Sequence, residues 1–117
     1  MPIKLKQALG KPSADDGKRI LVEKLWPRGL KKEEAHVDEW RRDAAPSNEL
    51  RKWYGHDPAK WSQFKEKYWK ELATKRDTVA KLAKECREKK VTFVFAAKEQ
   101  QYSNAVALKE YIEKQLK

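Results

Sequence analysis

At 117 residues the chain has the length of one domain, and 28 Lys and Arg against 18 Asp and Glu give a formal net charge of +10. No stretch approaches the ~20 apolar residues of a membrane span, and the first residues lack the apolar core of a signal peptide. The single cysteine excludes an internal disulfide, which suits a reducing compartment. We therefore expect one cytoplasmic domain over residues 1–117, with no membrane partner.

The first half of the chain alternates weak elements with loops. Residues 3–5 predict a short extended segment, and residues 10–17 a loop containing Pro and Asp. The apolar run at 20–25 predicts a buried strand that ends in the loop at 26–29. Proline fixes its own backbone angle and extends the residue before it, so this loop is stiff. Residues 31–36 favour a short helix.

The second half shows stronger patterns. Residues 37–42 are ambiguous, and Ser47 is a good helix N-cap. Apolar residues at spacings of three and four predict four helices, over residues 48–54, from 57 past 72, over 76–89, and from 103 to 116. The run at 91–96 is apolar on both faces, as expected of a central parallel strand.

Strands separated by helices indicate an α/β domain with a small, mostly parallel sheet flanked by helices. Right-handed crossovers bring the carboxyl ends of parallel strands to one edge of the sheet, where ligands of open α/β sheets usually bind. The loops at 26–29 and 97–104 should therefore meet at that edge.

Residues of these two loops predict a site for a small phosphate- or carboxylate-bearing ligand. Arg28 has a planar fork that suits either anion, although it can equally brace its loop by pairing with an acidic side chain. Lys98 would add charge, and Ser103 and Asn104 would offer hydrogen bonds at a helix start. Trp26 would form an apolar wall. A basic nucleic-acid-associated module and a protein-interaction domain remain the alternatives, and mixing of lysines with glutamates makes nucleic acid the less favoured partner.

A second set of candidates surrounds the helix at 48–54. Ser47 and Arg51 form another candidate anion site, although capping alone accounts for Ser47. His56 is a candidate acid or base because imidazole titrates near neutral pH, and bonding to backbone at the helix junction is its ordinary alternative. Two histidines and one cysteine, widely spaced, match no zinc pattern. We expect no metal and no cofactor.

The joint order of several motifs is specific. The sequence LWPRG at 25–29, APS at 45–47, GHD at 55–57 and the strand at 91–98 resembles the YeaO-like proteins of domain-of-unknown-function family 488. The resemblance covers nearly the whole chain. It implies a single-domain cytoplasmic protein of bacterial or archaeal type, and it implies no particular reaction.

One position departs from the family pattern. Relatives commonly carry Asn-His at the start of the last helix, where this chain has Ser103-Asn104. If that histidine is an acid or base in relatives, this chain lacks it. The departure makes ligand binding easier to defend than catalysis.

Overall fold

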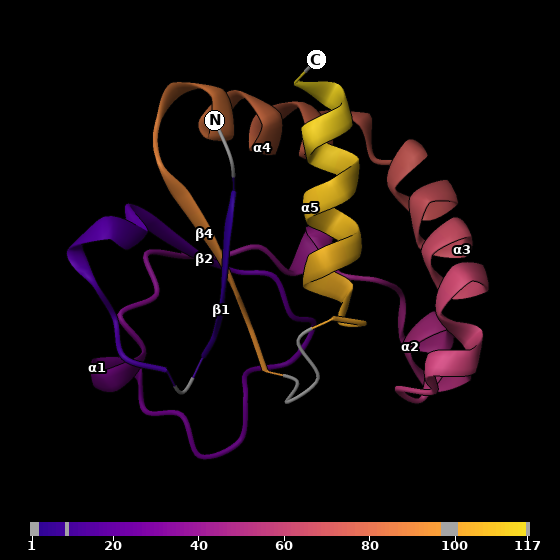
Figure 1. The fold of residues 1–117 in the computed structure, drawn as a ribbon, viewed down its shortest axis with the longest axis horizontal. Helices are drawn as coiled ribbons and strands as arrows, with labels where there is room; N and C mark the ends of the chain where they lie inside the picture. Colours follow the sequence, from indigo (N-terminus) through magenta and orange to yellow (C-terminus); the bar gives the residue numbers. More distant parts are fainter. Residues whose placement is uncertain (1–2, 9, 97–100, 117) are drawn as a thin grey trace.

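The computed structural model describes residues 3–8, 10–96 and 101–116. A four-stranded sheet forms the centre, with every neighbouring pair parallel and the order β1-β4-β2-β3 (Figure 1). The strands are β1 (Lys4–Gln7), β2 (Lys18–Leu21), β3 (Glu39–Trp40) and β4 (Val91–Phe95). The predicted α/β fold with a small parallel sheet is confirmed.

Among the described residues, five α-helices pack against the two faces of the sheet. They are α1 (Lys32–Ala35), α2 (Asn48–Tyr54), α3 (Trp61–Ala73), α4 (Arg76–Glu88) and α5 (Asn104–Gln115). The predicted ends of α2 are confirmed. Ser47 accepts a hydrogen bond from the Leu50 amide, and Gly55 ends the helix in the left-handed conformation at φ 52°.

The second strand is displaced from its predicted range of 20–25. It begins at Lys18 because that amide donates to the Lys90 carbonyl, and it ends at Leu21. Val22 still bonds to Val94, but the Glu23 carbonyl accepts from the Trp40 indole and not from a neighbouring strand. The polypeptide after Val22 therefore leaves the sheet at its carboxyl edge.

β4 occupies the middle of the sheet and all five of its residues are buried. Its side chains alternate between two cores. Phe93 and Phe95 join the larger core with α2, α3, α4 and α5, and in Figure 1 α5 lies between β4 and α3. Val94 joins the smaller core with Leu21 and Ala35 on the side of α1. Helices thus cover one face of the sheet, and α1 with its flanking loops covers the other.

Asp16 is buried on the α1 side of the sheet. Burial by itself raises the pKa of its carboxyl, but hydrogen bonds outweigh burial and bring that pKa well below its ordinary value. These bonds come from Lys6, the Ser13 amide, Arg19 and Lys4. Arg19 is itself buried and donates through Nη1 to Asp16 at 2.6 Å. The Asp16 carboxylate is thus occupied by partners within the chain, and the cluster serves to stabilise the fold.

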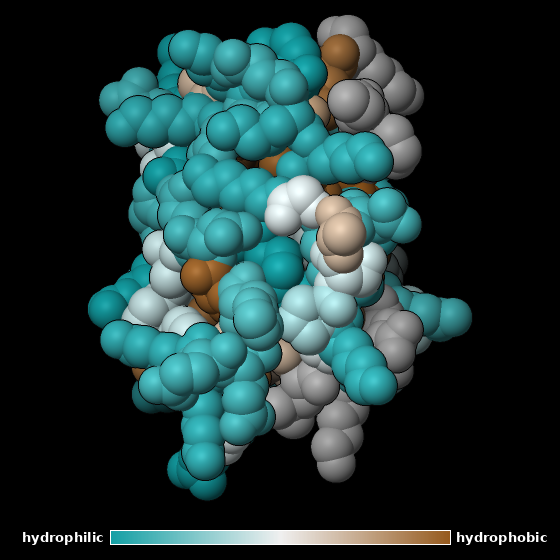
Figure 2. Space-filling view, turned by 90° about the vertical axis from the view of Figure 1, so that its left-hand side faces the viewer, coloured by the Kyte–Doolittle hydropathy of each residue, from teal (hydrophilic) through white to brown (hydrophobic). Residues whose placement is uncertain are grey.

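The surface is mostly polar. Figure 2 shows the left-hand side of Figure 1 as largely hydrophilic, with only small, separate apolar areas. Within the described ranges, no helix is long and apolar enough to cross a membrane.

Candidate functional site

Two adjoining cavities open at the carboxyl edge of the sheet, which lies at the bottom of Figure 1 where β4 ends and α5 begins. The inner cavity measures about 100 Å³ and reaches toward Phe64 and Asn104. The outer cavity measures about 300 Å³ and lies beside the loop at 25–27. Glu23, Arg51 and His56 line both cavities. We call these three residues together with Asn104 the edge site.

Glu23 stands where the chain leaves β2. Its half-buried carboxylate accepts hydrogen bonds from the Asn104 side chain and the Ala96 amide. The Asn104 amide also donates to the Val22 carbonyl at 2.9 Å, which fixes its orientation. Burial raises the pKa of Glu23, while the two hydrogen bonds and the charge of Arg51 oppose the rise. Glu23 is therefore a carboxylate that hydrogen bonds fix in place, with the Arg51 guanidinium as a nearby positive charge.

Arg51 projects from the middle of α2 and is half-buried. Its Nη1 donates to Asn48 Oδ1 at 3.1 Å, a bond to the same helix that limits its freedom. The nearby Tyr54 hydroxyl donates to the Tyr102 carbonyl at 2.7 Å and ties α2 to the segment before α5. The Arg51 guanidinium therefore extends from a helix, α2, whose position is fixed by a hydrogen bond to the segment before α5.

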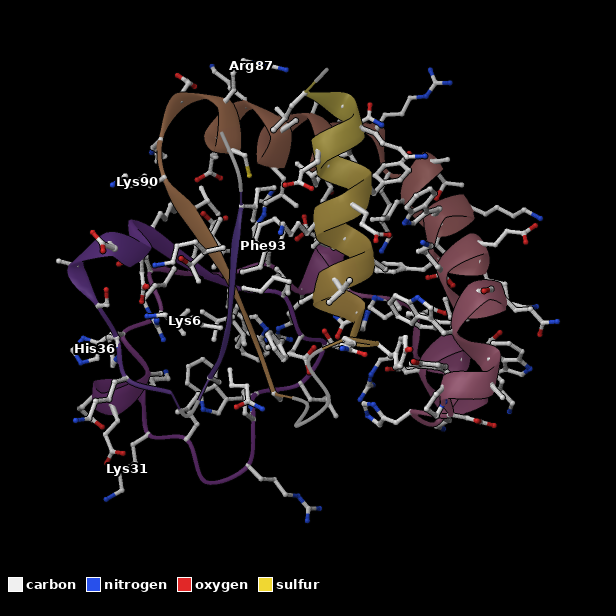
Figure 3. The ribbon with its side chains drawn as sticks, in the orientation of Figure 1. Lys6, Lys31, His36, Arg87, Lys90 and Phe93 are labelled. Atoms are coloured by element: carbon white, nitrogen blue, oxygen red, sulfur yellow. The ribbon has the colours of Figure 1, made fainter. Side chains whose placement is uncertain are left out.

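His56 lies at the mouth of both cavities. Its φ of 57° follows 52° at Gly55, so two consecutive residues take the left-handed conformation. That conformation is uncommon for a residue other than glycine, although histidine tolerates it better than most. The imidazole is exposed and its ring centre lies 6.1 Å from that of Tyr54. His36, the other histidine, lies beside α1, away from α2 (Figure 3).

The structure brings some of the predicted residues to the edge site and not others. Trp26 lines the outer cavity, where its indole nitrogen donates to the Leu30 carbonyl at 2.7 Å. Arg28 is exposed and lines neither cavity. Ser103 is buried, and its hydroxyl has no hydrogen-bond partner within the described part of the chain. Lys98 lies outside the described residues.

Ser47 is engaged elsewhere. Its hydroxyl accepts from the Leu50 amide and donates to Glu71 Oε2 at 2.6 Å, and its own amide donates to Glu71 Oε1 at 2.9 Å. These bonds join the start of α2 to α3. Ser47 therefore holds in place the helix that carries Arg51, and lines neither cavity itself.

Sequence reasoning missed Glu23 and Leu25. Both fall inside the apolar run that predicted a strand to residue 25, so they were assigned to the strand itself. A charge within a buried strand was the available signal for Glu23. Leu25 is 63% exposed beside the outer cavity, and its sequence offered no such signal.

Neither metal binding nor a reactive cysteine is supported by the described residues. Over residues 3–8, 10–96 and 101–116, no three His, Cys, Asp or Glu side chains gather as a metal site would require. Cys86 is buried in the larger core, and burial raises the pKa of its thiol to about 11. A thiol in that state is a poor nucleophile at neutral pH.

Comparisons with known proteins place the chain among relatives of similar length. A family model described as "Inactive DUF488-N3 subclade" matches residues 2–117. The uncharacterized protein YeaO of Escherichia coli (strain K12) is 34% identical over 112 residues, which cover 96% of this chain and 97% of YeaO. The uncharacterized protein Rv3073c of Mycobacterium tuberculosis is 47% identical over 58 residues, about half of each chain. No solved structure matches the present chain significantly. The chain therefore belongs to the YeaO-like proteins of domain-of-unknown-function family 488, in a subclade described as inactive.

Proposed function

We propose that the protein binds a small carboxylate- or phosphate-bearing ligand at the edge site and does not transform it. The observation that carries the proposal is Arg51, a half-buried guanidinium that lines both cavities. It lies at the carboxyl edge of a parallel sheet, where ligands of open α/β sheets usually bind. Its planar fork can hold either anion through two hydrogen bonds. Lys24, in the lining of the inner cavity, adds positive charge.

The proposal gives Arg51 the role that sequence reasoning gave to Arg28. Arg28 is exposed, and solvent screens a charge there far more than in a cavity. We expect Arg28→Ala to weaken ligand binding less than Arg51→Ala. A larger loss in Arg28→Ala than in Arg51→Ala would return the main role to Arg28.

Two observations support binding without catalysis. The resemblance expects a histidine where this chain has Asn104, and an amide side chain cannot carry a proton between groups. The matching subclade is also described as inactive. His56 lines both cavities, where its imidazole can form a hydrogen bond to a ligand.

The surroundings of two tryptophan rings argue against the nucleic-acid alternative. Trp53 and Trp69 are half-buried, and each has two lysine ammonium groups within 5.4 Å of its ring centre. The lysines over Trp53 are Lys60 and Lys67, and those over Trp69 are Lys65 and Lys114. Their ring faces are thus engaged within the chain, whereas base stacking needs a free face.

The test is titration of the protein with acetate and with inorganic phosphate at low ionic strength, followed by NMR. Arg51→Ala should weaken binding at least tenfold, because a hydrogen bond to a charged group contributes about 1.5–3 kcal/mol. The matched control is Lys52→Ala, which removes the same charge from the exposed neighbour on α2. Equal losses in the two variants would show that net charge, and not the edge site, attracts the anion.

A further inference from the structure

We propose that the ligand of the edge site is an α-amino acid with an apolar side chain. Its carboxylate would pair with Arg51, its ammonium group with Glu23, and its side chain would lie against Leu25. This inference rests on the proposed function, because it uses the same guanidinium.

The first step concerns the sign of the charges in the site. Arg51 and Glu23 line the same two cavities, so each cavity presents both a positive and a negative side chain to an occupant, and Lys24 adds a second positive charge to the inner one. A purely anionic ligand at Arg51 would also experience repulsion from the Glu23 carboxylate. A ligand with a cation next to its anion turns that repulsion into attraction. An α-amino acid carries both groups on one carbon atom.

The second step concerns the capacity of Glu23. An ionised carboxylate offers about four acceptor positions. The Asn104 side chain and the Ala96 amide donate to it, which leaves room for donors from a ligand. The same two donors fix the carboxylate in place, so little freedom is lost when an ammonium group binds. Glu23 is thus suited to receive N–H groups.

The third step concerns the outer cavity. Leu25 is 63% exposed, more than any other large hydrophobic side chain over the described residues. A single exposed leucine is ordinary on a protein surface, but this one lines a cavity of about 300 Å³ together with Trp26 and Pro27. The Trp26 ring packs edge-on against Trp40, at 5.5 Å between centres. Trp26 is thus packed against Trp40, and these apolar side chains adjoin the two charged groups.

The experiment compares four compounds by NMR titration of the wild-type protein. They are leucine, 4-methylpentanoate (leucine without its ammonium group), 3-methylbutylamine (leucine without its carboxylate) and glycine. We expect leucine to bind at least tenfold more tightly than each of the other three. This series needs no variant, so it decides the matter even if a substitution impairs folding.

Two variants then assign the contacts. Glu23→Gln preserves the shape of the side chain and removes its charge, so leucine should bind no better than 4-methylpentanoate. Leu25→Ser should reduce the advantage of leucine over glycine, because glycine has no side chain to contact residue 25. Circular dichroism spectra that match the wild type would verify that both variants are folded.

The outcomes separate this inference from the proposed function. If 4-methylpentanoate binds as tightly as leucine, or if Glu23→Gln leaves leucine binding unchanged, the amino-acid assignment is wrong. Arg51-dependent binding of acetate and phosphate would survive that result. An unchanged ratio of leucine to glycine in Leu25→Ser would overturn the role of the apolar wall. If none of the four compounds binds, the amino-acid assignment fails, and the proposed function fails as well only if acetate and phosphate also do not bind.

Discussion

Replacing Asp16 by asparagine should strongly destabilise the fold. The Asp16 side chain is fully buried and contacts Lys6 Nζ at 2.7 Å, Arg19 Nη1 at 2.6 Å and Lys4 Nζ at 3.3 Å. The two lysines are part-exposed, so their ion pairs contribute little. The Arg19 side chain is only 4% exposed and would be left as a buried charge without its carboxylate. Removing one partner of a buried pair costs about 3–5 kcal/mol.

The assay is urea unfolding at pH 7, followed by circular dichroism, for wild type and Asp16→Asn. The matched control is Asp15→Asn, which neutralises an exposed carboxylate in the same turn and should cost less than about 0.5 kcal/mol. A loss in Asp16→Asn that is no larger than the control would refute the reasoning.

The pH dependence provides a second check. The pKa of Asp16 is lowered in the folded protein, so its stabilising effect is complete above the unfolded value of about 3.9 and is lost as the pH falls below it. The difference between wild type and Asp16→Asn should therefore shrink below pH 4, by at most about 1.4 kcal/mol per pH unit. A difference that stays constant between pH 5 and pH 3 would contradict this assignment.

Three further predictions concern single side chains. Ser47→Ala should cost about 1–2 kcal/mol in urea unfolding, because α2 loses its cap and its bond to Glu71. Tyr68→Phe should cost about 1–3 kcal/mol in the same assay, because the buried Ala44 carbonyl loses the Tyr68 hydroxyl; no loss would mean that water replaces it. Cys86, whose thiol pKa is raised to about 11, should resist iodoacetamide at pH 8 and react once urea unfolds the chain, and rapid labelling of the folded protein would contradict its burial.

The sequence predicted the core better than it predicted the site. β4 was recognisable because its run is apolar on both faces, and only a central strand buries both. The helix from Asn48 to Tyr54 was recognisable because a serine that caps its start and a glycine that ends it stand at its two boundaries. These signals are local, so they survive without tertiary information.

The site depends on information that is not local. Arg28 and Arg51 both carry a guanidinium near the carboxyl edge, and only the path of the chain decides that Arg51 lines the cavities while Arg28 meets solvent. Glu23 was not predicted as a site residue, because the apolar run around it suggested a strand that continues to residue 25. β2 ends at Leu21, since the Trp40 indole takes the carbonyl of Glu23. A contact between residues 17 positions apart thus decides whether Glu23 is a strand residue or a site residue.

The strand order also has a consequence for biosynthesis. β1 and β2 are made before β4, yet each pairs with β4, which ends at Phe95. A nascent chain that stops before Val91 has the first two strands but lacks the strand that joins them. Contacts over such long separations slow folding, because the ends of a large loop must meet first. We therefore expect the sheet to assemble only after β4 has been made, when α3 and α4 are already available to form helices.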